Sequence, residues 1–304
     1  MDRPVLLVAV PLEPAELDRF RDAFDVVHAP SREAFAGALA GRGREVRAIV
    51  ARNVVPIGKG ELQSLPALEL VVVLGSGADA IDAEALAERE VRLATGRGVN
   101  AATVADHAMA LLLASLRNIV PLDRAVHAKG WGWTCEPPAS VPDTRLGIVG
   151  LGAIGRGIAR RAEAFGMDVA YHGRNPQPDT SYPYYADLAG MADWADALVL
   201  CCPGGPATHH IVNAGVLGRL GSRGHLVNVA RGSVVDTSAL VDCLENGMIA
   251  AAALDVLEAT PEEFARLAKL PNVLLTPHTA GRSPESLAAA LDVGLAHLRG
   301  HFSA

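Results

Sequence analysis

A glycine-rich segment near the middle of the chain constrains the fold more than any other feature of the sequence. Residues 145–155 read RLGIVGLGAIG, which places Gly150, Gly152 and Gly155 in G-x-G-x-x-G spacing. An apolar run precedes these glycines, and a helical pattern follows them over residues 158–165. In a strand–turn–helix unit the first glycine permits a sharp turn, the second admits a pyrophosphate, and the third lets helix and strand pack closely. The segment therefore predicts a dinucleotide site, with an ordinary turn as the alternative.

The residues after the next expected strand, 168–171, indicate which nucleotide this site binds. A unit specific for NAD usually carries an acidic residue about 20 residues past the glycines, where it accepts from the ribose 2′-hydroxyl. Here the strand is followed by Gly173, Arg174 and Asn175, and no acidic residue stands among them. Gly173 leaves room for a phosphate, and Arg174 offers it a planar fork of donors. NADP(H) is therefore the expected cofactor, while NAD(H) is the alternative if Arg174 is only a solvated loop residue.

The chain alternates short apolar strands with helical patterns, which predicts an α/β protein with two doubly wound parallel-sheet domains. The strands expected in the first unit are 5–10, 48–51, 70–74 and 91–94. Those expected in the second unit are 146–149, 168–171, 197–200, 225–229, 251–255 and 273–275. We expect a long helix over 101–126 and a last helix over 284–300 that packs back on the first unit. A Rossmann cofactor domain, residues 99–281, would then be inserted into a substrate domain made of residues 1–98 and 282–304.

Composition narrows the class of protein further. The chain has 304 residues, enough for two cores, and its 50% hydrophobic and 4% aromatic content suits an Ala/Val/Leu-rich α/β protein better than a β-sandwich. A net charge of −7 without basic clusters argues against nucleic acid as a partner. No run has the length of a membrane span or of a signal peptide, and the four cysteines lack metal-ligand spacing. We expect a cytoplasmic protein with no metal, in which Cys201 and Cys202 are buried filler.

Two polar residues follow strands of the second unit and could carry chemistry. Arg231 comes just after the strand 225–229, and His278 just after the strand 273–275. Arginine can hold a carboxylate and polarise an adjacent carbonyl, and histidine can exchange a proton near neutral pH. With hydride from a nicotinamide, the pair predicts a 2-keto acid reductase site, whereas an ordinary loop pair is the alternative.

The segments GLGAIG, NVARGSVVD, ALDV and TPH, in this order, resemble the D-isomer-specific 2-hydroxyacid dehydrogenases over nearly the whole chain. The stretch YHGRNPQP most resembles the NADPH-preferring glyoxylate/hydroxypyruvate reductases, with the hydroxyphenylpyruvate reductases close by. The resemblance implies that Arg231 binds the substrate carboxylate and carbonyl and that His278 donates the proton. It also implies that Ser76 and Gly77, in a G-x-G-x-D loop, hold the carboxylate through backbone N–H groups, and that Asp255 lies near the nicotinamide amide.

Further residues complete the expected cofactor site. Free N–H groups in the first turn of the helix after the glycines, at Ala153 and Ile154, should face the phosphates. The other residues expected to line the cofactor lie at or just past strand ends: Cys202, Pro203, Val229, Ala230, Arg231, Asp255 and His278.

One position departs from the family pattern. A catalytic glutamate is expected five residues past the aspartate of ALDV and just before a proline, but this chain has Thr260 before Pro261. Glu258 lies in the same segment two residues early, and a change of register that brings it to His278 is an alternative to true loss of the carboxylate. The departure supports a second hypothesis, a nucleotide-binding homologue with weak or lost catalysis that acts as a sensor or interaction module.

Several other residues have weaker patterns. Arg52 is a candidate substrate contact, with a surface arginine as the alternative. Trp131 and Trp133 could line a site of this chain or of a partner subunit, or fill a domain crossing. His107, His209 and His210 have no partner pattern and are expected to be structural. The family resemblance and the apolar surplus of the helix at 101–126 predict a homodimer.

Overall fold

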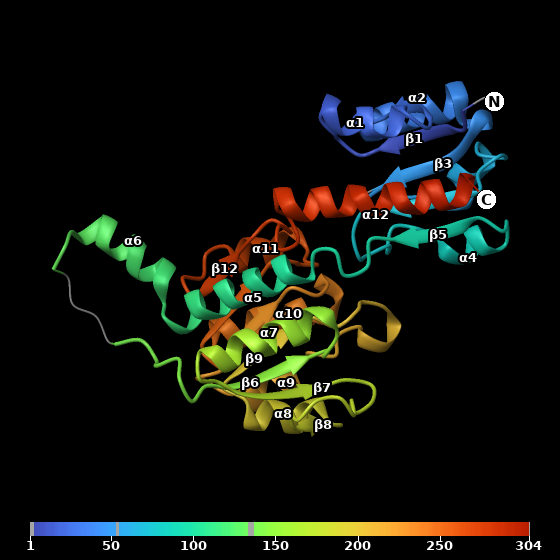
Figure 1. Ribbon diagram of the computed structural model, residues 1–304. Helices are drawn as coiled ribbons and strands as arrows, with labels where there is room; N and C mark the ends of the chain where they lie inside the picture. The colour runs from blue at the N-terminus through green and yellow to red at the C-terminus, as the bar shows by residue number, and fades with distance from the viewer. Residues whose placement is uncertain (1–2, 53–54, 133–136, 304) are drawn as a thin grey trace. The chain divides into compact units, whose positions relative to one another are not determined.

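The computed structural model describes residues 3–52, 55–132 and 137–303. The chain divides into two compact units, one made of Met1–Asn100 with Ser283–Ala304 and the other of Ala101–Arg282 (Figure 1). Each unit is built on a parallel sheet, so the predicted α/β fold class is confirmed. Cys135 and Trp133 lie outside the described residues.

The first unit holds a five-stranded sheet in the order β2-β1-β3-β4-β5, and each neighbouring pair is parallel. Its strands are β1 (Val5–Ala9), β2 (Asp25–His28), β3 (Val46–Ala51), β4 (Leu70–Val73) and β5 (Arg92–Thr95). Its helices are α1 (Pro14–Arg21), α2 (Arg32–Arg42), α3 (Lys59–Gln63), α4 (Ala83–Ala87) and α12 (Pro284–Phe302). Separate apolar clusters cover the two faces, as parallel sheets require. The sequence prediction missed β2, because DVVH is short, half-exposed and lies at the sheet edge.

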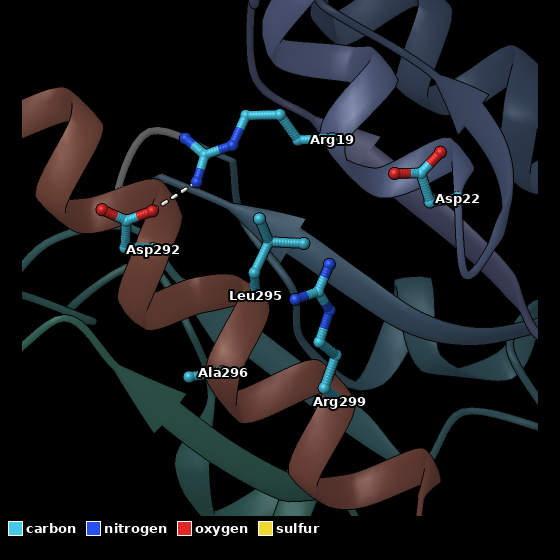
Figure 2. Close-up of a pocket in the computed structure, with 6 residues that line it drawn as sticks. All are labelled: Arg19, Asp22, Asp292, Leu295, Ala296 and Arg299. Atoms are coloured by element: carbon cyan, nitrogen blue, oxygen red, sulfur yellow. Dashed lines mark hydrogen bonds and ion pairs between the residues drawn. The ribbon is translucent and has the colours of Figure 1, made fainter.

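The last helix, α12, packs on β4 of this unit as predicted. Gly294 allows the close approach, since a Cβ there would lie 2.9 Å from Leu74 Cδ2. Leu291, Leu295 and Leu298 are buried in the cluster on this face. Figure 2 shows an ion pair between Arg19 of α1 and Asp292 of α12 at the rim of a surface pocket. The helix is therefore held by buried apolar area, which outweighs one exposed ion pair.

The second unit holds a seven-stranded parallel sheet in the order β12-β11-β10-β9-β6-β7-β8. Its strands are β6 (Arg145–Val149), β7 (Asp168–His172), β8 (Tyr184–Tyr185), β9 (Ala197–Leu200), β10 (His225–Asn228), β11 (Ala251–Leu254) and β12 (Val273–Leu275). The order reverses between β6 and β9, which is the switch point where doubly wound sheets bind their ligands. The predicted six strands become seven, because the two-residue edge strand β8 was missed.

The predicted single helix over 101–126 is wrong. The chain forms α5 (Ala101–Leu116) and α6 (Ile119–Lys129), separated by Asn118 in the left-handed conformation at φ 51°. Asparagine adopts this conformation more easily than other non-glycine residues, so the helix ends there. Buried residues of α5 such as Ala108 join the core beneath α7 (Ala153–Ala164), whereas α6 has no buried residue among those described.

The remaining helices connect the later strands of the second unit. They are α8 (Leu188–Trp194), α9 (Ala214–Leu220), α10 (Thr237–Glu245) and α11 (Pro261–Leu267). Among the helices of the described residues, each is too short or too polar to span a lipid bilayer. All candidate site residues of this unit lie at or just after the carboxyl ends of its strands. The loops concerned follow β6, β7, β9, β10, β11 and β12, at one end of the sheet.

Candidate functional site

The glycine loop between β6 and α7 has the geometry of a pyrophosphate cradle. Gly150 has φ +102°, and a Cβ there would lie 2.9 Å from the backbone nitrogen of Cys202. A Cβ on Gly155 would lie 2.1 Å from the Gly150 carbonyl oxygen, so close packing of helix and turn requires glycine there. Gly152 differs, because a Cβ there would meet nothing within 4 Å. The open space lies in front of the second glycine, where the expected cofactor needs it.

The first turn of α7 leaves backbone donors beside this space. Gly152 is the N-cap residue and provides no side chain to cap the helix. The N–H groups of Ala153 and Ile154 have no intrahelical acceptors at that position, and the helix dipole adds partial positive charge. Both residues lie at the surface or half-buried. The turn thus has donors of the kind that bind the phosphates of a dinucleotide.

Gly173, Arg174 and Asn175 follow β7, the strand beside β6 in the sheet. The hydroxyl of Tyr184 donates to the Gly173 carbonyl oxygen at 3.1 Å, which ties the segment to β8. A Cβ on Gly173 would meet nothing within 4 Å. Arg174 and Asn175 are exposed, and no described residue forms an ion pair with Arg174. The guanidinium of Arg156, by contrast, is paired with Asp179 at 2.7 Å. Arg174 is therefore a cation that can receive an anionic group.

The thiols that follow β9 pack against the glycine loop. Cys201 Sγ donates to the Gly150 carbonyl oxygen at 3.0 Å. Burial raises the pKa of the Cys201 thiol strongly, and it raises the pKa of Cys202 to about 11. Both thiols are thus held protonated near neutral pH, although both residues are only half-buried and not fully buried as predicted. Pro203 follows them and is exposed.

Arg231 follows β10 in a turn whose shape is set by a buried amide. Asn228 is 1% exposed, and its side chain accepts from the Ala230 N–H and donates to the Arg231 carbonyl oxygen, each at 3.0 Å. The guanidinium of Arg231 donates to the Ala230 carbonyl oxygen at 2.8 Å. Val229 and Ala230 are buried, so the turn sits on the core. Asn228 was not among the predicted site residues, although a polar residue inside the apolar run LVNVA was a signal for it.

Two glycines without a Cβ allow the Arg231 turn to pack closely against its neighbours. A Cβ on Gly204 would lie 2.8 Å from Arg231 Cγ, and a Cβ on Gly232 would lie 2.3 Å from the backbone nitrogen of Glu258. The loops after β9, β10 and β11 are therefore packed together at this end of the sheet. The stem of Arg231 is held in place by backbone, which limits the positions its guanidinium can reach.

A buried carboxylate anchors the loop that carries His278. Asp255, at the end of β11, is 3% exposed. It accepts from the Thr276 hydroxyl at 2.6 Å and from the backbone N–H groups of Thr279 and Ala280 at 2.8 and 3.0 Å. The observed partners of Asp255 are thus loop donors, which gives it a structural role in addition to the cofactor role that the resemblance implies.

His278 itself has an unusual backbone conformation. Its φ is +51°, and its N–H points to both the Asp255 and Thr276 carbonyl oxygens, at 2.9 and 3.0 Å. A left-handed residue other than glycine carries roughly 1–2 kcal/mol of strain, so it persists only where its surroundings fix it. The imidazole is exposed, and no described residue hydrogen-bonds to it. The ring is therefore free to meet a ligand.

Thr260 has a clear local role at the position where the family pattern expects glutamate. It is the N-cap of α11: its hydroxyl accepts from the Glu263 N–H at 3.2 Å, and the Glu263 carboxylate accepts from the Thr260 N–H at 2.7 Å. This capping box explains threonine before Pro261. The Glu258 side chain is exposed, and its backbone carbonyl accepts from the Thr237 hydroxyl at 2.6 Å. Neither Thr260 nor Glu258 hydrogen-bonds to His278 in the described structure.

The remaining candidates, in the first unit, include the loop after β4. Gly75 has φ +135°, and Ser76 donates to Asn100 Oδ1 at 3.2 Å, so the loop is tied to the segment after β5. Ser76 is exposed and Gly77 half-buried. Arg52 follows β3 and lines a cavity of about 220 Å³, whose wall also includes Phe35. These three candidates therefore lie after two neighbouring strands of one sheet.

Comparison with known proteins identifies the relatives of the chain. Residues 109–280 match the D-isomer specific 2-hydroxyacid dehydrogenase, NAD binding domain. The chain belongs to the D-isomer specific 2-hydroxyacid dehydrogenase family. It is thus a 2-hydroxyacid dehydrogenase that uses a nicotinamide cofactor, which the glycine loop fits.

Individual relatives of this dehydrogenase match most of its length. It is 38% identical to glyoxylate/hydroxypyruvate reductase HPR3 of Arabidopsis thaliana over 84% of this chain and 80% of that one. It is 35% identical to hydroxyphenylpyruvate reductase of Plectranthus scutellarioides, over 95% and 91%. Its structure superposes with a TM-score of 0.91, at 36% identity, on an NADPH-dependent glyoxylate/hydroxypyruvate reductase from Sinorhizobium meliloti in complex with NADP and malonate, covering 99% and 94%.

Other residues singled out by the sequence take no visible part in the dehydrogenase site. Trp131 is 94% exposed. His209 and His210 stack on each other with ring centroids 3.9 Å apart and are exposed. Among the described residues, no group of three or more metal-binding side chains occurs. His107, also expected to be structural, hydrogen-bonds to Thr276 in the loop that carries His278.

Proposed function

We propose that this dehydrogenase reduces a small 2-keto acid, such as glyoxylate or hydroxypyruvate, to the D-2-hydroxy acid with NADPH. The observation that carries the proposal is the placement of Arg231 and His278 just after β10 and β12. They lie at the same end of the sheet as the glycine loop that follows β6. A guanidinium, an imidazole and a dinucleotide cradle on one edge are the parts that keto-acid reduction needs. The names of relatives in both comparisons support this substrate class.

Arg231 and His278 have different proposed roles in the reaction. Arg231 holds the substrate carboxylate and polarises the neighbouring carbonyl with its paired donors. When bound, the nicotinamide supplies a hydride to the carbonyl carbon. His278 donates a proton to the carbonyl oxygen, so the C=O bond becomes H–C–O–H with one hydride and one proton added. In the first unit, we assign the backbone N–H groups of Ser76 and Gly77 to the carboxylate and Arg52 to the rest of the substrate.

A panel of 2-keto acids tests the function directly. NADPH oxidation with glyoxylate, hydroxypyruvate, hydroxyphenylpyruvate and 2-ketogluconate should show turnover with at least one small acid. The competing hypothesis is a nucleotide-binding sensor without catalysis. It is favoured by Thr260, which stands where the family pattern expects a catalytic glutamate and whose hydroxyl caps α11. Tight NADPH binding without turnover on any member of the panel, by wild type or by Thr260→Glu, would support the sensor instead.

The proposed preference for NADPH predicts a cofactor test. NADPH should bind at least about tenfold more tightly than NADH, since Arg174 can pair with the 2′-phosphate and Gly173 has no side chain that accepts from a 2′-hydroxyl. Arg174→Ala should remove most of the difference by weakening NADPH binding, with NADH affinity nearly unchanged. Calorimetric titration of both nucleotides measures it. Arg160→Ala, which removes an exposed arginine from α7, is the control. Equal affinities in the wild type would contradict the preference.

We also propose a homodimer. Helix α6 carries Ile119, Leu122 and Val126 on one face, yet none of its residues is buried within the chain. An apolar stripe left half-exposed on a helix is the kind of surface that a second subunit covers. Light scattering at micromolar concentration should return twice the 31.6 kDa chain mass, and Leu122→Glu should shift the protein toward the single-chain mass. A monomeric wild type would rule the dimer out.

A further inference from the structure

His107, on α5, is joined to the loop that carries the proposed proton donor. Its Nε2 lies 3.1 Å from Thr276 Oγ1 and 3.6 Å from Asp255 Oδ1. Thr276 in turn bonds Asp255 at 2.6 Å, and Asp255 holds the backbone on the far side of His278. One chain of polar contacts therefore runs from a helix to both ends of the loop. The function derived so far gives His107 no role.

The directions of these hydrogen bonds follow from the available protons. A threonine hydroxyl has one proton, and at 2.6 Å from a carboxylate oxygen it donates that proton to Asp255. The lone pairs of Thr276 Oγ1 then face His107, so the bond between them requires a proton on His107 Nε2. The imidazole is thus the donor, and Thr276 relays its polarity to Asp255.

The burial of Asp255 makes the hydrogen bond donated by His107 important for stability. The Asp255 side chain is 1% exposed, and a buried carboxylate needs every available donor. His107 is the basic side chain that lies within ion-pair distance of it among the described residues. Its own side chain is 23% exposed, because α5 holds it at the boundary between core and surface. Without His107, Thr276 Oγ1 would accept no hydrogen bond from a histidine. The hydroxyl that donates to Asp255 would then be less polarised, so the carboxylate would be less well stabilised.

The helix that presents His107 is firmly fixed. Ala105 and Ala108, its neighbours on α5, are fully buried, and a Cβ added at Gly157 of α7 would lie 3.0 Å from Ala105 Cβ. The loop, by contrast, holds His278 in a strained left-handed conformation. A strained residue persists where rigid surroundings determine it, and α5 provides such a support.

We infer that His107 is a positioning residue for the reaction, which fixes the His278 loop by donating to Thr276 beside the Asp255 carboxylate. The inference rests on the proposed function, in which His278 is the proton donor. His107 touches neither substrate nor cofactor in this assignment and acts only through the loop. Displacement of a catalytic group by about 1 Å can lower a rate by about a hundredfold.

Steady-state kinetics of two variants tests the inference. His107→Leu should lower kcat for the best keto acid by about 10- to 100-fold, with KM and NADPH affinity changed by less than about threefold. His107→Gln, whose amide N–H can reach the same position as Nε2, should recover most of the lost kcat. Thr276→Val removes the relay and keeps the shape; it should lower kcat similarly, and the double variant should be no slower than the slower single one.

A matched control separates positioning from stability. His225 also pairs with a hydroxyl of α5, at 2.8 Å between Nδ1 and Ser115 Oγ, but it lies at the start of β10, away from the loops. His225→Leu should leave kcat within about twofold even where it lowers Tm. His278→Gln serves as the benchmark for the proposed function, and it should abolish most reduction.

The outcomes are distinguishable. Full kcat in His278→Gln would contradict the proposed proton donor, and with it the proposed function. Loss of activity in His278→Gln together with full kcat in both His107→Leu and Thr276→Val would overturn only the positioning role. A fall in kcat that Gln does not recover, parallel to a fall in Tm, would make His107 structural. If His107→Leu does not fold, the contrast between Thr276→Val and Thr276→Ser decides, with only Ser expected to keep the rate.

Discussion

Arg231→Ala is expected to lower kcat/KM for 2-keto acid reduction by about a thousandfold, which corresponds to roughly 4 kcal/mol. The loss is large because the substrate carboxylate and the charge that develops on the carbonyl oxygen would both lack a cationic partner. Affinity for NADPH should stay within about threefold, since the proposed partners of the guanidinium belong to the substrate. Stopped-flow or steady-state kinetics with calorimetric cofactor titration measures both quantities.

The side chain of Arg231 also contributes to its turn, so controls for folding are needed. Its guanidinium donates to the Ala230 carbonyl, and its stem packs against Gly204. Arg231→Lys keeps a cation on a long stem but loses the paired fork, and it should recover only part of the rate. Arg219→Ala breaks an exposed ion pair with Asp193 in the same unit and should change neither rate nor, by more than about 1 kcal/mol, stability. Undiminished reduction by folded Arg231→Ala would reject the assigned role.

Much of this architecture was accessible from the sequence because parallel strands buried on both faces read as short apolar runs. The runs at β4 and β9, for instance, are buried along their whole length. Polar residues that follow such runs must lie at the carboxyl ends of the strands, so the sequence alone places Arg231 and His278 at the same end of the sheet. The departure at Thr260 was also visible, although its reason, a capping box with Glu263, depends on where α11 begins.

Other features depend on tertiary context that a local pattern does not carry. The strands β2 and β8 are edge strands, and the partial exposure of an edge removes the apolar signal. The break between α5 and α6 depends on a single left-handed residue, Asn118. The contact of His107 with Thr276 joins residues 169 positions apart, so no local spacing could indicate it. Long-range polar pairs of this kind determine how a candidate site is held, and they require a structure.

The glycines of the cofactor loop predict two opposite phenotypes from similar substitutions. Gly152 has backbone angles of φ −82° and ψ −160°, which any residue adopts, and open space in front of it. Gly152→Val should therefore fold with nearly wild-type Tm, yet weaken NADPH binding by about a hundredfold, or roughly 2.7 kcal/mol, because the added methyl groups occupy the place of the pyrophosphate. Gly155→Ala adds a Cβ 2.1 Å from the Gly150 carbonyl oxygen, which the backbone can relieve only by moving the helix.

Gly155→Ala should accordingly lower the free energy of unfolding by about 1–3 kcal/mol, with cofactor affinity falling as a consequence of the displaced loop. Urea denaturation monitored by circular dichroism, paired with calorimetric titration of NADPH, separates the two effects. Gly218→Ala is the matched control, because a Cβ there would make only an ordinary contact, 3.8 Å from Met248 Cε, on α9. Unweakened NADPH binding by folded Gly152→Val would place the pyrophosphate elsewhere. The contrast follows from what each glycine faces. A side chain at Gly152 would occupy open space and exclude the ligand, whereas a side chain at Gly155 would clash with backbone and destabilise the fold.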